Sequence, residues 1–235
     1  MMEHTWASGS VELLRHADSH IHLESAFDRR IAFISIDNSV ETSIRTFLSL
    51  PRSKSGVMVA RKDLDAVENS FPGLLSLLWA HAGDRLTGID EADIEHYHRI
   101  RNKLYHDGTG LSVDDQYLLA YRQIAVLLLK KLFGVDLGEP RPASTLERLI
   151  LLWNQVEEKL KSLMKGEGID LGATFKWDSA LTAGVLTPDD IHELTQLRMV
   201  RNKQVHSSSL DRKQIDYAVQ LAEALLKRLE QRASH

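Results

Sequence analysis

The sequence predicts an all-α protein made of two tandem antiparallel helical bundles, and three observations support this fold class. Apolar residues recur at the spacing of an amphipathic helix in most segments of the 235-residue chain. No segment sustains the two-residue alternation of a β-strand, since the strand-like run 57–60 is too short to build a sheet. Finally, the pattern Arg-Asn-Lys-x-x-His occurs at 101–106 and again at 201–206, 201 − 101 = 100 residues later. The chain therefore contains a duplicated module.

The similarity of the two modules extends beyond this motif at the same offset. The matched pairs are Leu86 with Leu186, Thr87 with Thr187, Asp90 with Asp190, Ile94 with Leu194, and Tyr117 with Tyr217. A looser upstream alignment matches 38–41, Asn-Ser-Val-Glu, with 154–157, Asn-Gln-Val-Glu. We therefore expect the two motif helices to occupy equivalent places in two similar bundles.

The expected domain organisation follows from the repeat and from one segment rich in glycine and proline. We expect an N-terminal helical extension at 1–27, a first bundle at 28–134, a linker at 135–143 and a second bundle at 144–233. The linker is assigned from Gly138, Pro140 and Pro142, because these residue types interrupt regular structure. Each bundle is then about the size of a small domain.

Apolar stripes and breaking residues locate the helices before the first motif. Ser10 is the expected N-cap of a helix that ends near Ile21. A longer helix is expected over 28–50, where Pro51 stops it. Its stripe consists of Phe33, Ile36, Val40, Ile44 and Phe47. A further helix is expected from Asp63, with an interruption at 71–73.

The first motif helix is expected from Asp90 to His106, with acidic residues in its first turn. Ile94, Tyr97, Arg101 and Leu104 fall on one stripe of this helix. Arg101 is therefore directed along the packed face, where an arginine needs a partner. Ser112 with Asp115 predicts a capping box for the following helix, which runs to Gly134.

The second module repeats this order. Ser144 and Glu147 predict the start of a helix with the stripe Leu149, Leu152, Val156, Leu160 and Leu163. A short helix is expected over 176–183, and Thr187-Pro188 begins the second motif helix. Its stripe holds Leu194, Leu197, Arg201 and Val205, which repeats the inward placement of the first arginine. A last helix passes through Tyr217 to Leu229.

The amino-acid composition restricts the cellular compartment and the class of partner that we expect. The sequence has no cysteine, so it can form no disulfide and no thiolate metal site, which suits a reducing cytoplasm. The longest apolar run, 124–129, is too short to cross a bilayer, so we expect no membrane association. With a net charge of −4, the chain does not bind nucleic acid through bulk electrostatics. Any such contact must be local, as at the cations of the motif helices: Arg99, Arg101, Lys103, Arg198, Arg201 and Lys203.

No metal or other cofactor is expected. His16 and His20 are one helical turn apart, but no acidic or thiol partner stands at a recognised spacing. Within each motif, the asparagine and the histidine are four residues apart and share a helix face, whereas the arginine points to the side. Each histidine falls at the end of its helix, where the last turn can loosen and bring it toward its arginine.

The duplicated motif resembles that of HEPN domains, in which an arginine, a polar residue and a histidine stand near the end of the third long helix of a small bundle. The resemblance covers about 28–134 and 144–229. It implies a pair of HEPN-type bundles that form a pseudo-dimer within one chain, with both motifs facing a composite cleft. Many HEPN proteins are metal-independent endoribonucleases of toxin–antitoxin, anti-phage defence and RNA-processing systems.

The resemblance implies that Arg101, His106, Arg201 and His206 are catalytic. Histidine titrates in the range needed to move protons at neutral pH, and arginine supplies a permanent cation for the phosphate oxygens. Asn102 and Asn202 would orient the histidines. Contacts to flanking RNA phosphates would come from Lys103, Lys203, Arg99 and Arg198. The expected products carry a 2′,3′-cyclic phosphate and a 5′-hydroxyl.

Alternatives stay open at this level. The inward arginines can tie helices together, and a histidine at a helix C-terminus is favourable for its dipole alone. The protein would then be a non-catalytic scaffold or a nucleotide- or RNA-binding module that works with a partner. Either way, an antitoxin, a sensor protein or a second copy of the chain is a possible partner. The tyrosine that HEPN toxins carry two residues after the histidine is replaced by Gly108 and Ser208. Tyr105 could stack on a base or pack inside the bundle.

Overall fold

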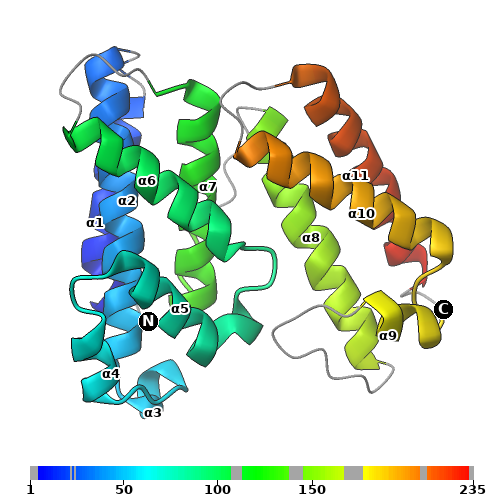
Figure 1. Cartoon of the computed structure of the whole chain (residues 1–235), viewed down its shortest axis with the longest axis horizontal. Helices are drawn as coiled ribbons and strands as arrows, with labels where there is room; N and C mark the ends of the chain where they lie inside the picture. The colour runs from blue at the N-terminus through cyan, green and yellow to red at the C-terminus, as the bar shows by residue number, and fades with distance from the viewer. Residues whose placement is uncertain are drawn as a thin grey trace. The chain divides into compact units, whose positions relative to one another are not determined.

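A computed structural model describes residues 5–21, 23, 25–106, 113–137, 145–166, 177–206 and 211–232. Helices account for the regular structure in these ranges, and no strand occurs in them, so the all-α prediction is confirmed. The chain divides into two compact units, unit 1 at 1–141 and unit 2 at 142–235 (Figure 1). In the helices described, no segment is long and apolar enough to cross a membrane.

Unit 1 contains seven α-helices within its described residues, and two of them are short. The helices are α1 (Ser8–Ile21), α2 (Ala26–Ser49), α3 (Arg52–Ser55), α4 (Arg61–Ala66), α5 (Phe71–Ala82), α6 (Glu91–His106) and α7 (Asp115–Phe133), with 3-10 turns at Thr5–Ala7 and Gly83–Arg85. Helix α2 contacts α1, α7, α5 and α6, which makes it the central helix of the unit. Figure 1 shows α1, α2 and α7 side by side, with α6 crossing them obliquely.

The core of unit 1 forms along α2 because its apolar stripe repeats at helical spacing. Phe33, Ile36, Val40, Ile44 and Phe47 are all 0% exposed, which confirms the predicted stripe. Ser25 caps α2 by accepting a hydrogen bond from the Asp28 backbone N–H, and Leu50 ends it just before Pro51. The predicted range 28–50 is therefore close to the observed Ala26–Ser49.

Several ends of the unit 1 helices differ from the sequence expectation. The predicted N-terminal extension contains α1, which packs along α2 more extensively than any other helix pair in the unit. The cap of α7 is Asp114, whose carboxylate accepts from the Gln116 backbone N–H. The predicted cap Ser112 lies outside the described residues. The interruption expected at 71–73 lies earlier in the structure, because α4 ends at Ala66 and residues 71–73 form the first turn of α5, with Ser70 as its N-cap.

Unit 2 contains α8 (Thr145–Gly166), α9 (Trp177–Thr182), α10 (Pro188–Val205) and α11 (Arg212–Arg232). Helices α8 and α11 pack along each other, and α10 packs mainly on α11. The predicted stripe of α8 is buried at Leu149, Leu152, Val156 and Leu160, whereas Leu163 is only partly buried. Ser144, the predicted start of this helix, and residues 138–143 of the predicted linker lie outside the described residues.

Helix α10 begins where the sequence predicts, with Thr187 as its N-cap, and the structure shows a capping box there. The Thr187 hydroxyl accepts from the Asp190 backbone N–H at 3.2 Å, and the Asp190 carboxylate accepts from the Thr187 backbone N–H at 2.8 Å. Asp190 is also bound to α11, since Arg232 Nη1 donates to its Oδ2 at 2.6 Å. The capping residue thus joins the start of α10 to the end of α11.

Candidate functional site

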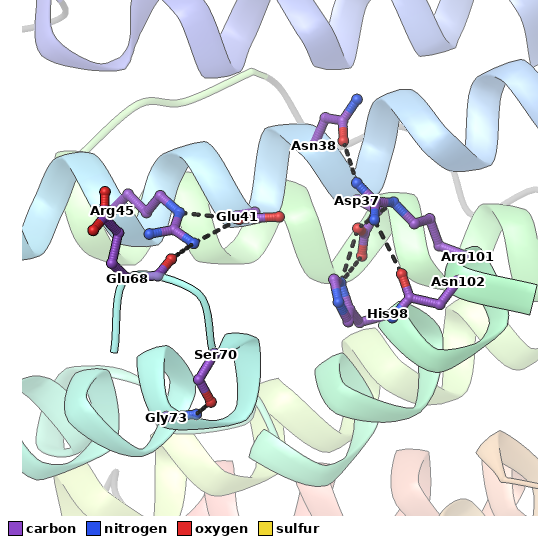
Figure 2. A network of polar contacts seen from close by, with 10 residues as sticks. All are labelled: Asp37, Asn38, Glu41, Arg45, Glu68, Ser70, Gly73, His98, Arg101 and Asn102. Atoms are coloured by element: carbon purple, nitrogen blue, oxygen red, sulfur yellow. Dashed lines mark hydrogen bonds and ion pairs between the residues drawn. The ribbon is translucent and has the colours of Figure 1, made fainter. Parts of the chain in front are cut away.

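Arg101 is the centre of the polar cluster in unit 1 (Figure 2). Its Nη2 donates to Asn38 Oδ1 at 3.0 Å, and its Nη1 donates to Asn102 Oδ1 at 3.0 Å. Its Nε lies 3.2 Å from Oδ2 of Asp37 in an ion pair. The sequence predicts that this inward arginine needs partners, and α2 supplies two of them. The guanidinium is therefore held in one orientation while 21% of the side chain stays exposed.

Asp37 is the buried anion of this cluster and the residue that sequence reasoning missed. It is 0% exposed, and its carboxylate receives donors from two other helices. Tyr121 Oη on α7 donates to Oδ1 at 2.6 Å, and His98 Nδ1 on α6 lies 3.0 Å from Oδ2. A buried carboxylate is costly unless it is paired and hydrogen-bonded, and here it is both. Asp37 therefore ties α2, α6 and α7 together at the point where Arg101 is held.

Tyr121 stays protonated in this environment. Burial raises the pKa of Tyr121 well above its ordinary value, and the negative charge of Asp37 and the hydrogen bond to it raise the pKa further. The ring is held between aromatic neighbours, since Tyr97 stacks on it with centroids 4.6 Å apart and Phe33 lies at 5.3 Å. The phenol is therefore a fixed donor to Asp37.

His98 lies on α6, three residues before Arg101, and is a further partner of the Asp37 carboxylate. Its ring stacks on Phe71 of α5 with centroids 3.7 Å apart and planes inclined by 12°. Because residues three apart on a helix share a face, His98 and Arg101 both reach the same carboxylate on α2. Each of these contacts joins residues far apart in sequence, so only the packing of the helices brings them together.

The motif of unit 2 is less accessible. Arg201 is 1% exposed, compared with the partly exposed Arg101, although its Nη1 likewise donates to the following asparagine, Asn202, at 3.1 Å. The repeat alignment places Trp153 where unit 1 has Asp37, and Trp153 is 5% exposed. It also places Arg198 opposite His98 and Leu221 opposite Tyr121. The arginine is repeated, but the residue aligned with Asp37 is a tryptophan.

The two histidines of the motifs stand at the ends of their helices, as predicted. His106 is the last residue of α6, and its side chain lies outside the described part of the structure. His206 is the C-cap residue of α10, and its backbone N–H donates to Asn202 O at 3.1 Å. In both motifs the asparagine oxygen is bound to the arginine. Any orienting of the histidine would therefore fall to the amide nitrogen of the asparagine.

The other predicted contact residues are exposed cations. Lys103 and Arg99 lie on α6, where Arg99 pairs with Glu95 at 3.3 Å. Arg198 and Lys203 lie on α10, where the Lys203 ammonium is 3.4 Å from Gln214 Oε1. Exposed contacts of this kind contribute little to stability. Arg99 and Lys203 can therefore exchange them for contacts with phosphate groups.

The cluster includes one set of metal-ligand types, Asp37, Glu41 and His98, whose ligand atoms lie within 4.8 Å of one another. The charges of this set are already balanced by arginines. Arg101 pairs with Asp37, and Arg45 Nη2 lies 2.9 Å from Glu41 Oε1. A divalent cation would have to displace these guanidinium groups or lie beside them. The set therefore fits an ion-pair network better than a metal centre.

His16 and His20, considered above as a metal-binding pair, contact each other, and His20 also contacts Asp28. Their rings meet edge to face with centroids 4.8 Å apart, and His20 Nδ1 lies 2.8 Å from Asp28 Oδ1. The hydrogen bonds of Asp28 to Ser25 and to His20 lower the pKa of its carboxyl. His20 therefore joins the end of α1 to the start of α2.

Comparison of the chain with protein-family models, with characterised proteins and with solved structures gives no match. The functional argument therefore depends on the motif and on the geometry of this cluster.

Proposed function

We propose that this protein is a metal-independent endoribonuclease that cleaves RNA by attack of a ribose 2′-hydroxyl. The observation that carries the proposal is the Arg101 guanidinium, which is fixed by Asp37, Asn38 and Asn102 yet partly exposed at the end of the helix that terminates in His106. An arginine fixed in this way is preorganised for a phosphate group, because its orientation costs nothing further when the substrate binds.

The donors of Arg101 support a phosphate contact. A guanidinium has five N–H donors. Among the described residues, each Nη atom of Arg101 has one hydrogen-bond acceptor, which leaves one further N–H on each. Two parallel N–H groups match two non-bridging oxygens of a phosphodiester. In the transition state these oxygens carry more negative charge, and Arg101 would stabilise it.

The proton transfers are assigned to the motif histidines. The 2′-oxygen bonds to phosphorus as its proton passes to a neutral imidazole acting as the base, and the P–O5′ bond breaks as a protonated imidazole gives its proton to the leaving oxygen. The products are a 2′,3′-cyclic phosphate and a 5′-hydroxyl, with no net gain or loss of protons. We assign these roles to His106 and His206, while Lys103, Lys203, Arg99 and Arg198 would hold flanking phosphates.

The resemblance to HEPN proteins further suggests the biological setting. We propose that the protein acts as a toxin or an anti-phage effector on RNA in the cytoplasm, under the control of an antitoxin or a sensor protein. Self-association of the tandem unit is compatible with this role. Expression of the active protein should then slow growth, and alanine at either motif histidine should relieve the effect.

One observation favours a second candidate, a non-catalytic scaffold or RNA-binding module. Arg201 is almost completely buried, and Arg101 bridges α6 to α2, as structural arginines do. In that case the arginines would hold the bundles together, and the exposed cations would bind RNA or a partner protein. The two candidates differ in whether RNA is cut.

The deciding experiment incubates the purified full chain with end-labelled single-stranded RNA and with bulk tRNA in excess EDTA. His106→Ala, His206→Ala and the double variant are assayed in parallel, with His192→Ala as an exposed histidine control on α10. We expect cleavage that survives the chelator, leaves cyclic-phosphate ends and is lost in the double variant. Binding without cleavage by the wild type would instead support the second candidate.

A further inference from the structure

Tyr105 is an exposed aromatic residue directly beside the arginine of the candidate site. It is 56% exposed, so it lies at the surface of the bundle. The Arg101 guanidinium lies over its ring, 4.8 Å from the centroid. Since α6 places residues four apart on one face, Tyr105 extends the face that carries Arg101 toward the end of the helix.

The exposure of Tyr105 sets it apart from the other tyrosines of α6 and α7. Tyr97 and Tyr121 are 0% exposed and serve the core, and Tyr117 is partly buried, whereas Tyr105 presents more than half of its surface to solvent. Large aromatic surface at the edge of a cation site is typical of proteins that bind single-stranded nucleic acid. There the bases stack on the rings and the backbone follows the positive charges.

We infer that Tyr105 is a stacking platform for a nucleobase next to the phosphate held by Arg101. The inference rests on the proposed function and deepens it by naming the substrate class. A base can lie on Tyr105 only when it has left a helix, because a paired and stacked base presents no free face. The substrate is therefore single-stranded RNA, or an unpaired loop of a folded RNA.

The charges around the ring suit this ligand. Arg101 is fixed by Asp37 and Asn38, so its cation stays beside the platform. A phosphate on Arg101 and a base on Tyr105 would belong to the same or adjacent nucleotides. The Arg101 cation is also attracted to the electron-rich face of the Tyr105 ring.

The position of the second module that corresponds to Tyr105 offers no platform. The residue that corresponds to Tyr105 is Val205, which is 0% exposed, and the adjacent arginine is buried as well. The duplicated motif thus has two different surroundings, and recognition of the base falls to the first module. Substitution of Tyr105 is expected to change substrate binding, whereas the second module offers no exposed aromatic side chain at this position.

A binding measurement tests this inference without requiring cleavage. The full chain is titrated into a single-stranded 2′-O-methyl oligonucleotide that carries one 2-aminopurine, a base whose fluorescence falls when it stacks. Tyr105→Ala should remove the quenching and weaken binding about tenfold, and Tyr105→Phe should retain both, because the ring and not the hydroxyl carries the stacking. Tyr217→Ala is the matched control, since Tyr217 is a 51% exposed tyrosine on α11.

A parallel cleavage assay separates failure of this inference from failure of the proposed function. Wild-type protein that cuts RNA in EDTA, together with equal quenching in Tyr105→Ala and wild type, would overturn the stacking platform and leave the ribonuclease standing. Quenching that depends on Tyr105, together with no cleavage by the wild type, would support the platform on a binding module. Equal binding of duplex and single-stranded oligonucleotides would also contradict the inference. Thermal unfolding checks that the exposed substitution leaves the fold intact.

Discussion

Asp37 on α2 and Arg101 on α6 form an ion pair in which the carboxylate Oδ2 lies 3.2 Å from the guanidinium Nε. The carboxylate is completely buried, and it also accepts from Tyr121 and lies against His98. The same pair therefore stabilises the bundle and orients the arginine of the candidate site. Two kinds of consequence, for stability and for activity, can be tested separately.

Asp37→Asn should lower both stability and activity. The substitution keeps the shape of the side chain but leaves the Arg101 cation without its buried counter-charge, at a cost of about 3 kcal/mol in the free energy of unfolding. Urea unfolding measures this cost, and RNA cleavage should fall because Arg101 loses its fixed orientation. Glu95→Gln is the control, since it removes an exposed ion pair with Arg99 on the same helix and should change stability by less than about 0.5 kcal/mol. Equal effects of the two substitutions would contradict the role of Asp37.

Tyr121→Phe should remove a contribution to the free energy of unfolding that is present at neutral pH and is lost at alkaline pH. The hydroxyl donates to a buried carboxylate, so its loss should cost about 2 kcal/mol at neutral pH. Burial raises the pKa of Tyr121 above its ordinary value of 10.0, and Asp37 adds to the shift. In the unfolded chain the phenol ionises near 10.0, so this contribution is complete below that pH and is lost as pH rises toward the higher pKa of the folded state.

The measurement compares urea unfolding of wild type and Tyr121→Phe at neutral pH and above pH 10.0. The difference between the two proteins isolates this phenol from the other groups that titrate in the same range. The difference should shrink as pH rises. A constant difference would mean that the pKa of Tyr121 is not raised in the folded state.

Arg201→Ala should destabilise unit 2 strongly, whereas Arg198→Ala should not. Arg201 is 1% exposed and Arg198 is exposed on the same helix, so the pair compares a buried with a solvated arginine. Loss of the buried guanidinium, with its contact to Asn202, should cost about 3 kcal/mol, and loss of the exposed one less than about 0.5 kcal/mol. Chemical denaturation followed by circular dichroism measures both costs. Similar costs for the two variants would show that Arg201 is not a structural element of α10.

Asp190→Asn should weaken the start of α10 and reduce the acid sensitivity of unit 2. Burial acts to raise the pKa of Asp190, but the hydrogen bonds from the Thr187 backbone and from Arg232 outweigh it, and the net effect is a lowered pKa. The stabilising effect of the carboxylate is therefore complete above the ordinary value of 3.8 and is lost as pH falls through the lower pKa of the folded state.

At neutral pH this substitution should cost about 2 kcal/mol, the scale of hydrogen bonds to a charged group. Unfolding curves at neutral pH and below pH 3.8 test the prediction, and the gap between wild type and variant should narrow in acid. Asp189→Asn is the control, because Asp189 is an exposed acid in the same helical turn. If the difference in the free energy of unfolding between wild type and Asp190→Asn persisted in acid, the effect would come from the geometry of the side chain and not from its charge.

Several features of the fold depend on local periodicity and can be predicted from single segments of the chain. The stripe of α2, the stop at Pro51, the start of α10 at Thr187 and the inward placement of Arg101 and Arg201 follow from residue types and from the 3.6-residue turn of a helix. The sequence also located both motif histidines at helix ends. These features are short-range, so one segment of chain contains the information for each of them.

The surroundings of each arginine depend on how the helices pack together. Asp37 stands next to Asn38, which the repeat alignment had singled out, yet the pairing of Asp37 with Arg101 depends on how α2 and α6 cross and on their register. Tyr121 reaches the same carboxylate from a third helix. Crossing angle and register are set by packing across the whole core, which helical periodicity does not encode. For the same reason the motif repeats while its surroundings do not, with an acid anchoring Arg101 and Trp153 at the matching position in unit 2.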